Sequence, residues 1–272
     1  MAVRKRAMKK RAAPTSTTPR LARTQLWIFD FDNTLARLEP EVDWAAGRRE
    51  LEPMLRALEI PEDLFEKVPR GNLPLYNATR SRLLELAASR NGSFSMKQVR
   101  SILRSASKMI ERYEMAGVDR AAPLEGALEL LIALRKGGAR IAIVTSNSSR
   151  TIRRWFSIHR SRSLIDEIVG RDSLLALKPS PEMLVRALEL CGVGARDAVF
   201  VGDADSDYRA ASSVGVEFLG VAASQASRDA LAAAGARRIF SSPAALGIEL
   251  RILDSPIAAT GHDTQPRSSR RS

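Results

Sequence analysis

The 272-residue sequence has little cysteine and little histidine, with Cys191 as its one cysteine and His159 and His262 as its histidines. A lone cysteine excludes an internal disulfide, and two histidines argue against a histidine-ligated zinc site or a serine–histidine catalytic centre. No apolar run approaches the roughly 18 residues that a membrane span needs, and no apolar secretory signal follows the basic N-terminus. We therefore expect no membrane association, a cytoplasmic location, and chemistry that depends on carboxylates, hydroxyls and lysine.

The net charge of +12 is concentrated at the two ends of the chain. Residues Met1–Thr24 contain eight basic side chains and no acidic one, and Ser255–Ser272 contain three arginines against Asp263. The remaining body is therefore close to neutral, at about +2. Because both ends lack periodic apolar residues, we expect residues 1–24 and 255–272 to be disordered tails.

The basic N-terminal tail has three interpretations, which the sequence leaves open. A solvated extension without a role of its own is favoured by its composition. A tail that binds nucleic acid or another polyanion would act through phosphate contacts. A basic, hydroxyl-containing and acid-free segment also fits an organelle transit peptide.

Three short apolar runs each end in a polar cluster. The runs and the clusters after them are Leu26–Phe29 before Asp30–Leu35, Ile141–Val144 before Thr145–Asn147, and Ala198–Val201 before Gly202–Asp207. Such runs are typical of strands buried on both faces. Weaker strands are expected at Glu167–Val169, Val216–Val221 and Arg238–Phe240.

Helical patterns at Gly126–Lys136 and Pro181–Leu190 separate the later strands. Strands that alternate with helices of this length predict an α/β fold, a three-layer Rossmann-like parallel sheet with helices on both faces. In such sheets ligands bind at the carboxyl ends of the strands. The three polar clusters should therefore converge on one site.

A long stretch between the first two strong strands shows helical patterns and no convincing strand. Its clearest helices are Asn77–Ala88 and Ser95–Tyr113. Because this stretch is too long for an ordinary loop, we interpret residues 37–119 as an inserted all-helical cap domain. Residues 25–36 and 120–254 then form the core domain.

The polar clusters carry residue types that suit phosphoryl chemistry. Asp30 and Asp32 are two positions apart, so in extended chain both can address one ligand. A carboxylate attacks an anionic phosphate ester only if a cation offsets the repulsion, and a divalent metal does so. Asp203 and Asp207 offer oxygen ligands for a hard ion such as Mg²⁺.

Three further residues complete this candidate site. The hydroxyl and backbone N–H groups at Thr145 and Ser146 can hold phosphate oxygens. We expect Ser146 and its neighbour Asn147 to bind the substrate. Lys178, in the segment Leu177-Lys178-Pro179-Ser180-Pro181, adds a positive charge where negative charge develops.

Together these segments resemble the four ordered motifs of the haloacid dehalogenase-like hydrolase superfamily, and the resemblance covers roughly residues 26–247. Asp30–Leu35 resembles the first motif, Thr145 the second, Lys178 with its prolines the third, and Gly202–Asp207 the fourth. The helical insertion resembles the cap of phosphoglycolate phosphatase-like members, which closes over the site.

The resemblance implies a role for each residue. Asp30 is expected to attack phosphorus and to carry an aspartyl-phosphate intermediate, while Asp32 protonates the leaving oxygen and later deprotonates water. Mg²⁺ is expected on the Asp30 carboxylate, the Asp32 backbone carbonyl and Asp203, with Asp207 ordering the ligands through water or Lys178. Thr145 is expected to bind a phosphoryl oxygen.

Two positions refine this interpretation. Asn33 stands where many members have glycine, and asparagine tolerates the left-handed backbone better than most residues, so the turn can form. Branches of the superfamily that act on other bonds lack the second aspartate, so Asp32 favours phosphate monoesters. Asp205 does not fit the motif spacing, and we expect it to face solvent.

The predicted function is Mg²⁺-dependent hydrolysis of a phosphate monoester of a small metabolite. A phosphomutase shares all four motifs and stays a possible alternative. A second alternative, from another class, is a polyanion-binding protein whose hydrolase body is non-catalytic. The sequence does not specify the substrate or the oligomeric state.

The polyanion alternative predicts that deletion of Met1–Thr24 weakens nucleic-acid binding and flattens its salt dependence, because fewer counterions are released per complex. The measurement is a binding titration of both proteins at several salt concentrations. An unchanged salt slope would exclude the tail as the binding element.

Overall fold

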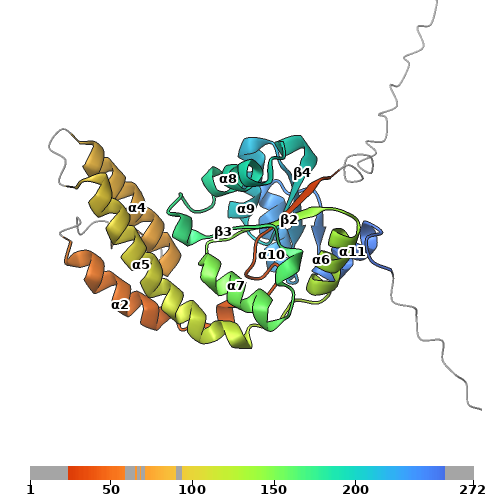
Figure 1. Ribbon diagram of the computed structural model, residues 1–272, viewed down its shortest axis with the longest axis horizontal. Helices are drawn as coiled ribbons and strands as arrows, with labels where there is room; N and C mark the ends of the chain where they lie inside the picture. Colours follow the sequence, from red (N-terminus) through yellow and green to blue (C-terminus); the bar gives the residue numbers. More distant parts are fainter. Residues whose placement is uncertain (1–23, 59–64, 66–67, 69–70, 90–93, 255–272) are drawn as a thin grey trace, which may run out of the picture.

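The computed structural model describes residues 24–58, 65, 68, 71–89 and 94–254. Within these residues lies one sheet of six parallel strands in the order β3-β2-β1-β4-β5-β6 (Figure 1). The strands are β1 Leu26–Phe29, β2 Arg140–Val144, β3 Glu167–Val169, β4 Ala198–Gly202, β5 Glu217–Val221 and β6 Ile239–Phe240. Each expected strand is present, so the predicted parallel α/β sheet is confirmed.

Helices cover both faces of this sheet. They are α6 Ala127–Lys136, α7 Ser149–Ile158, α8 Glu182–Cys191, α9 Asp205–Val214, α10 Gln225–Ala234 and α11 Pro243–Glu249. Side chains alternate along a strand, so Leu26 and Ile28 of β1 share a core with α8 and α9. Trp27 and Phe29 point the other way, into a core with α6, α7 and α11. The result is the expected three-layer Rossmann-like arrangement.

Between β1 and β2 the described residues form helices and no strand. These helices are α2 Trp44–Arg56, α4 Asn72–Ala88 and α5 Met96–Gly117, with the 3₁₀ turns η1 Glu39–Glu41 and η2 Val118–Arg120. The three α-helices pack on one another and stand to one side of the sheet (Figure 1). The all-helical insertion is thus present, whereas its boundary at residues 37–119 stays a prediction.

Several helix ends differ from the sequence-based expectation. Helix α4 begins at Asn72 rather than Asn77, and α5 continues to Gly117 rather than Tyr113. Pro181 precedes α8 as its N-cap instead of lying in its first turn. Helix ends depend on capping and on tertiary contacts, which apolar spacing does not report.

Helix α2 was not predicted, and two residues explain why. It contains Gly47 and Pro53, both unfavourable inside a helix. Packing favours glycine at position 47, since a Cβ there would lie 2.7 Å from the amide nitrogen of the Asn72 side chain, which would have to shift. Leu51 and Leu55 are fully buried, so tertiary packing outweighs the poor local propensity.

Helix α7 anchors the loop that follows β1. Its Trp155 is fully buried and lies edge-on to Phe31, with ring centroids 5.3 Å apart. The Trp155 indole N–H also donates to the Ala121 carbonyl oxygen at 2.7 Å. Because Phe31 lies between Asp30 and Asp32, this contact holds both carboxylates at the end of β1.

Among the described residues, no helix combines the length and hydrophobicity needed to cross a bilayer. Disorder is predicted for residues 1–24 and 255–272, and all of these except Thr24 lie outside the described part of the chain. The predicted cytoplasmic location and the alternative of a transit peptide stay predictions.

We expect Trp155→Ala to lower the free energy of unfolding by about 3–5 kcal/mol, because it removes a fully buried aromatic ring from the core. Ile158→Ala on the same helix is the control, since Ile158 is 38% exposed and should cost less than about 1 kcal/mol. Urea unfolding measures both values. Equal losses in the two variants would contradict the anchoring role of Trp155.

Candidate active site

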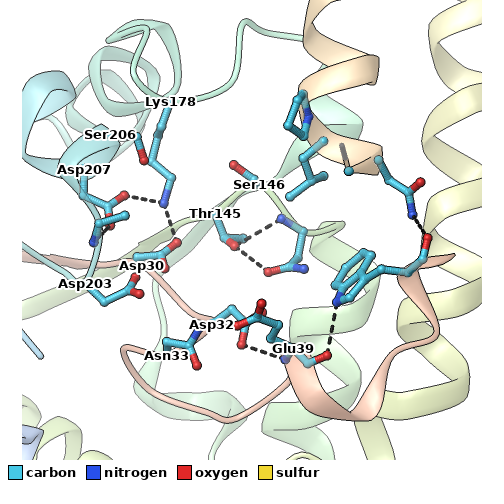
Figure 2. A pocket seen from close by; sticks show the side chains of 17 residues that line it. Asp30, Asp32, Asn33, Glu39, Thr145, Ser146, Lys178, Asp203, Ser206 and Asp207 are labelled. Carbon is cyan, nitrogen blue, oxygen red and sulfur yellow. Dashed lines mark hydrogen bonds and ion pairs between the residues drawn. The ribbon is translucent and has the colours of Figure 1, made fainter. Parts of the chain in front are cut away.

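The carboxyl ends of three neighbouring strands meet at one edge of the sheet. β1 lies between β2 and β4, and Phe29 at its end pairs with Ile143 and Val201. Asp30, Thr145 and Asp203 follow these three strands directly and therefore lie side by side (Figure 2). The convergence expected from the strand ends is present.

A pocket of about 480 Å³ opens over this edge. Its floor includes every residue of the predicted site: Asp30, Asp32, Thr145, Ser146, Asn147, Lys178, Asp203 and Asp207. Its opposite wall comes from the helical insertion and comprises Trp44, Gly71, Asn72, Leu73 and Pro74. A ligand in the pocket would therefore touch both the sheet edge and the helices that stand over it.

Lys178 lies between two buried carboxylates. Its ammonium contacts Asp30 through a hydrogen bond, and its Nζ lies 2.6 Å from Oδ1 of Asp207 in an ion pair that lacks hydrogen-bond geometry. All three side chains are at least nine-tenths buried. Burial lowers the pKa of Lys178, but the charges of Asp207 and Asp30 outweigh this effect and hold it above its ordinary value. Lys178 is therefore a permanent cation.

Asp30 and Asp203 are carboxylates whose negative charges are only partly offset by the nearby ammonium of Lys178. Burial raises the pKa of Asp30 to about 7, with Lys178 opposing the shift and Asp207 adding to it. Burial and the negative charges of Asp30 and Asp207 raise the pKa of Asp203 to about 8. One oxygen from each of these three aspartates lies within 4.8 Å of the others. Three hard oxygen donors at this spacing can hold a divalent metal ion.

The structure distinguishes between the three aspartates of this group. Asp207 is engaged by Lys178 through one oxygen and by the Ala204 backbone N–H, at 3.1 Å, through the other. Asp203 accepts a long hydrogen bond of 3.5 Å from the Thr34 hydroxyl, and Asp30 contacts Lys178. Asp30 and Asp203 are thus better placed as direct metal ligands, with Asp207 orienting Lys178.

Asp32 is held in a separate environment by the turn that follows it. Its Oδ1 accepts hydrogen bonds from the backbone N–H groups of Leu38 and Glu39, at 2.9 and 3.0 Å. Burial raises its pKa to about 6, against the opposing effect of these two N–H groups. Asn33 adopts φ = 57°, the left-handed conformation expected at this position. A carboxyl group with this pKa is suited to giving and taking a proton near neutral pH.

The turn after β2 presents Thr145 and Ser146 to the pocket (Figure 2). The Thr145 hydroxyl donates to Oδ1 of Asn147 at 3.0 Å and accepts from the Asn147 backbone N–H at 3.2 Å. The Asn147 amide nitrogen donates to Glu114 at 3.2 Å. Both ends of the Asn147 side chain therefore have partners inside the protein. This geometry favours a role for Asn147 in positioning Thr145 rather than the expected contact with substrate.

Glu114 and Arg171 support this turn and were not predicted from the sequence. Both are fully buried, and both contact residues 145–151 or their immediate neighbours. Glu114 occupies an inward-facing position of α5, where a carboxylate among apolar residues was a usable signal. Arg171, which follows β3 after Gly170, gave no such signal.

The lining of the pocket does not include Asp205, Cys191 or His159. Asp205 is exposed and pairs with Arg209 on the same helix, as expected of a solvent-facing residue. Cys191 is buried at the end of α8. His159 packs against Trp155 with tilted rings whose centroids are 4.4 Å apart.

Comparison with known proteins agrees with this geometry. The family model described as haloacid dehalogenase-like hydrolase matches residues 78–221, more than half of the chain. The chain belongs to the haloacid dehalogenase-like hydrolase family. This membership confirms the family expected from the four motifs and, with it, a hydrolytic enzyme. Asp30 and Asp32 precede the matched residues, so their roles rest on the geometry above.

Curated relatives of this hydrolase include enzymes with different substrates. A phosphoglycolate phosphatase of Rhodospirillum rubrum is 28% identical over 220 residues, which cover 81% of this chain and 88% of the relative. A pyrophosphatase, PpaX, of Halalkalibacterium halodurans is 30% identical over 95 residues, which cover 35% of this chain and 44% of the relative. The similarity therefore extends over most of the chain only for the first of these two.

Solved structures share the fold. The structure of CbbY from Rhodobacter sphaeroides in complex with phosphate superposes with a TM-score of 0.53 at 22% identity, covering 82% of this chain and 96% of that one. A hydrolase from Pseudomonas syringae gives 0.51 at 23% identity, covering 85% and 100%. At these identities the structures confirm the α/β architecture with its helical insertion and carry no argument on substrate.

Proposed function

We propose that this protein is a Mg²⁺-dependent phosphohydrolase that cleaves phosphate monoesters of a small metabolite through an aspartyl-phosphate at Asp30. The observation that carries the proposal is the convergence of Asp30, Asp32, Thr145, Lys178 and Asp203 on one pocket (Figure 2). Each residue supplies a different part of the chemistry. The phosphatases named among the relatives support the same reaction class.

Asp30 is the nucleophile in this scheme. Its carboxylate oxygen forms a bond to phosphorus as the ester P–O bond breaks, and Asp32 transfers its proton to the departing oxygen. Water then attacks the phosphorus of the aspartyl-phosphate, and Asp32 takes a proton from that water as the bond to Asp30 breaks. The products are the free alcohol and inorganic phosphate, with both aspartates restored.

Lys178 and Thr145 hold the transferred group. The Lys178 ammonium beside Asp30 stabilises the negative charge that develops on the phosphoryl oxygens. The Thr145 hydroxyl can turn from Asn147 to a phosphoryl oxygen while it continues to accept the Asn147 backbone N–H. Ser146 on the same turn adds a second hydroxyl.

The charge of the pocket supports a role for a divalent cation. Among its described lining residues, five carboxylates face one ammonium, that of Lys178: Asp30, Asp32, Glu39, Asp203 and Asp207. A phosphate ester is itself an anion, so it would be repelled from this pocket. We propose that Asp30, Asp203 and the Asp32 backbone carbonyl hold Mg²⁺, whose charge offsets the repulsion and polarises the phosphoryl oxygens.

The proposed substrate is small because the insertion limits the pocket. Trp44 of α2 and the start of α4 face the catalytic carboxylates across the pocket. We propose that these helices act as a cap that excludes water during phosphoryl transfer. Relatives with similar sequences act on phosphoglycolate or pyrophosphate, so family membership alone does not select the substrate.

We expect Asp30→Asn to lower kcat at least about 10³-fold, because the amide cannot form the aspartyl-phosphate. Phosphate release from a panel of phosphomonoesters in the presence of Mg²⁺ measures the effect. Asp205→Asn is the control, since Asp205 is exposed on the neighbouring helix and should leave kcat unchanged. Full activity of Asp30→Asn would remove the proposed nucleophile.

The same assay separates hydrolysis from the phosphomutase alternative. A hydrolase releases inorganic phosphate in proportion to substrate consumed. A mutase leaves the phosphate on the carbon skeleton of the product, which ³¹P NMR detects.

We expect Mg²⁺ to stabilise the wild-type protein by about 2.7 kcal/mol at 100 times its Kd, because the ion binds only the folded state. Asp203→Asn should lose most of this gain. The same substitution should not destabilise the metal-free protein, because it removes a carboxylate that Asp30 and Asp207 repel. Thermal unfolding with and without Mg²⁺ measures both effects, and Asp205→Asn again serves as the control. An Asp203→Asn protein that gains as much from Mg²⁺ as the wild type would contradict the assigned ligand.

A further inference from the structure

A buried ion pair joins the helical insertion to the sheet behind the phosphate-binding turn. Glu114 of α5 and Arg171, at the start of the 3₁₀ turn η4 (Arg171–Ser173) after β3, are 0% exposed, with Arg171 Nη1 2.7 Å from Glu114 Oε1. The two residues are 57 positions apart in the sequence. The pair lies outside the set of residues that the proposed reaction uses directly.

Arg171 spreads its donors over two elements. On α5 it donates to the hydroxyl and the carbonyl oxygen of Ser107, at 3.3 and 3.2 Å. On the turn after β2 it donates to the Ser146 carbonyl oxygen at 2.8 Å, and its backbone N–H donates to the Asn147 carbonyl oxygen at 2.8 Å. One guanidinium group therefore fixes the backbone of the turn against α5.

Glu114 receives four donors, and three of them come from the segment that continues this turn. Asn147 donates through its side-chain amide at 3.2 Å, Ser148 through its backbone N–H at 3.0 Å, and Thr151 through its hydroxyl at 3.0 Å. The fourth is Arg171. Both carboxylate oxygens thus accept hydrogen bonds from residues 147–151, and Oε1 also accepts one from Arg171.

This arrangement determines which way the Asn147 amide faces. Because Glu114 can only accept hydrogen bonds, it takes the amide nitrogen, and the amide oxygen must face Thr145. That oxygen accepts the Thr145 hydroxyl at 3.0 Å. The carboxylate of Glu114 therefore controls, through one intervening side chain, the orientation of the hydroxyl that lines the pocket.

We propose that Glu114 and Arg171 are positioning residues for phosphate binding. They hold the Thr145–Asn147 turn in the shape that accepts a phosphoryl oxygen, and they fix its position relative to α5. This inference rests on the proposed phosphohydrolase function. A buried ion pair is a weak source of stability, because apolar side chains of similar volume often serve the fold as well. Its five hydrogen bonds to residues 146–151 are better explained by a role in positioning the turn than by a gain in stability.

The test compares a neutral pair with the wild type. Glu114→Gln/Arg171→Met keeps the approximate volumes and removes both charges, so the fold should survive with an unfolding midpoint close to that of the wild type. We expect KM for p-nitrophenyl phosphate and Kd for inorganic phosphate, measured by calorimetry with Mg²⁺, to rise at least tenfold. The control is Arg154→Met, which breaks the exposed Arg154–Asp119 pair between α7 and η2 without touching the turn. It should leave both constants unchanged.

Arg171→Lys is the second variant, in case the neutral pair does not fold. Lysine keeps the charge beside Glu114 but cannot reach Ser107 and Ser146 at the same time. We expect this variant to fold and to bind inorganic phosphate several-fold more weakly, with a larger effect on KM than on kcat. Wild-type KM and phosphate Kd in either folded variant would overturn the inference.

The outcomes also separate this inference from the function on which it rests. A wild-type protein that neither binds inorganic phosphate nor hydrolyses phosphomonoesters would overturn both. A wild-type protein that does both, with a neutral pair that does so equally well, would overturn the positioning role and leave the phosphohydrolase proposal intact.

Discussion

Repulsion between buried carboxylates is the constraint on which the rest of the site depends. Asp30, Asp203 and Asp207 meet where three strands end, and the raised pKa values of Asp30 and Asp203 express the cost of placing them there. Lys178 lies between Asp30 and Asp207, and its positive charge offsets part of that cost. A phosphate ester would bring further negative charge, and the Mg²⁺ ion proposed for this site would offset it during binding and during the proposed attack by Asp30.

The fold prevents these groups from moving apart. β1 is central in the sheet, so Asp30, the proposed nucleophile, lies between the turn after β2 and the acidic loop after β4. Phe31 is packed against Trp155, which fixes the two aspartates on either side of it. Glu114 and Arg171 fix the turn after β2 from the side of α5. The mutually repelling carboxylates are therefore held in place by apolar packing of Phe31 on Trp155, and the turn beside them by the buried Glu114–Arg171 ion pair.

Local sequence was sufficient to predict a feature wherever a single segment contains the residue pattern that produces it. Apolar runs that end in Asp30, Thr145 and Asp203 predicted the strands and the convergence, and the left-handed Asn33 followed from the chemistry of asparagine. Helix α2 was missed because Gly47 and Pro53 weaken its pattern, while its stability comes from tertiary burial. The Glu114–Arg171 pair was missed because it joins distant positions, and the direction of the Asn147 amide depends on that pair.

Asp30 is proposed to carry the phosphoryl group during turnover. The most direct test is to mix the protein with Mg²⁺ and a phosphomonoester and to quench the reaction in acid during turnover. Borohydride then reduces an aspartyl-phosphate to homoserine with release of phosphate, and peptide mass spectrometry locates the homoserine. We predict homoserine at position 30 of the wild-type protein. Turnover that leaves Asp30 unmodified, or that places homoserine at another aspartate, would contradict the role of Asp30 as nucleophile.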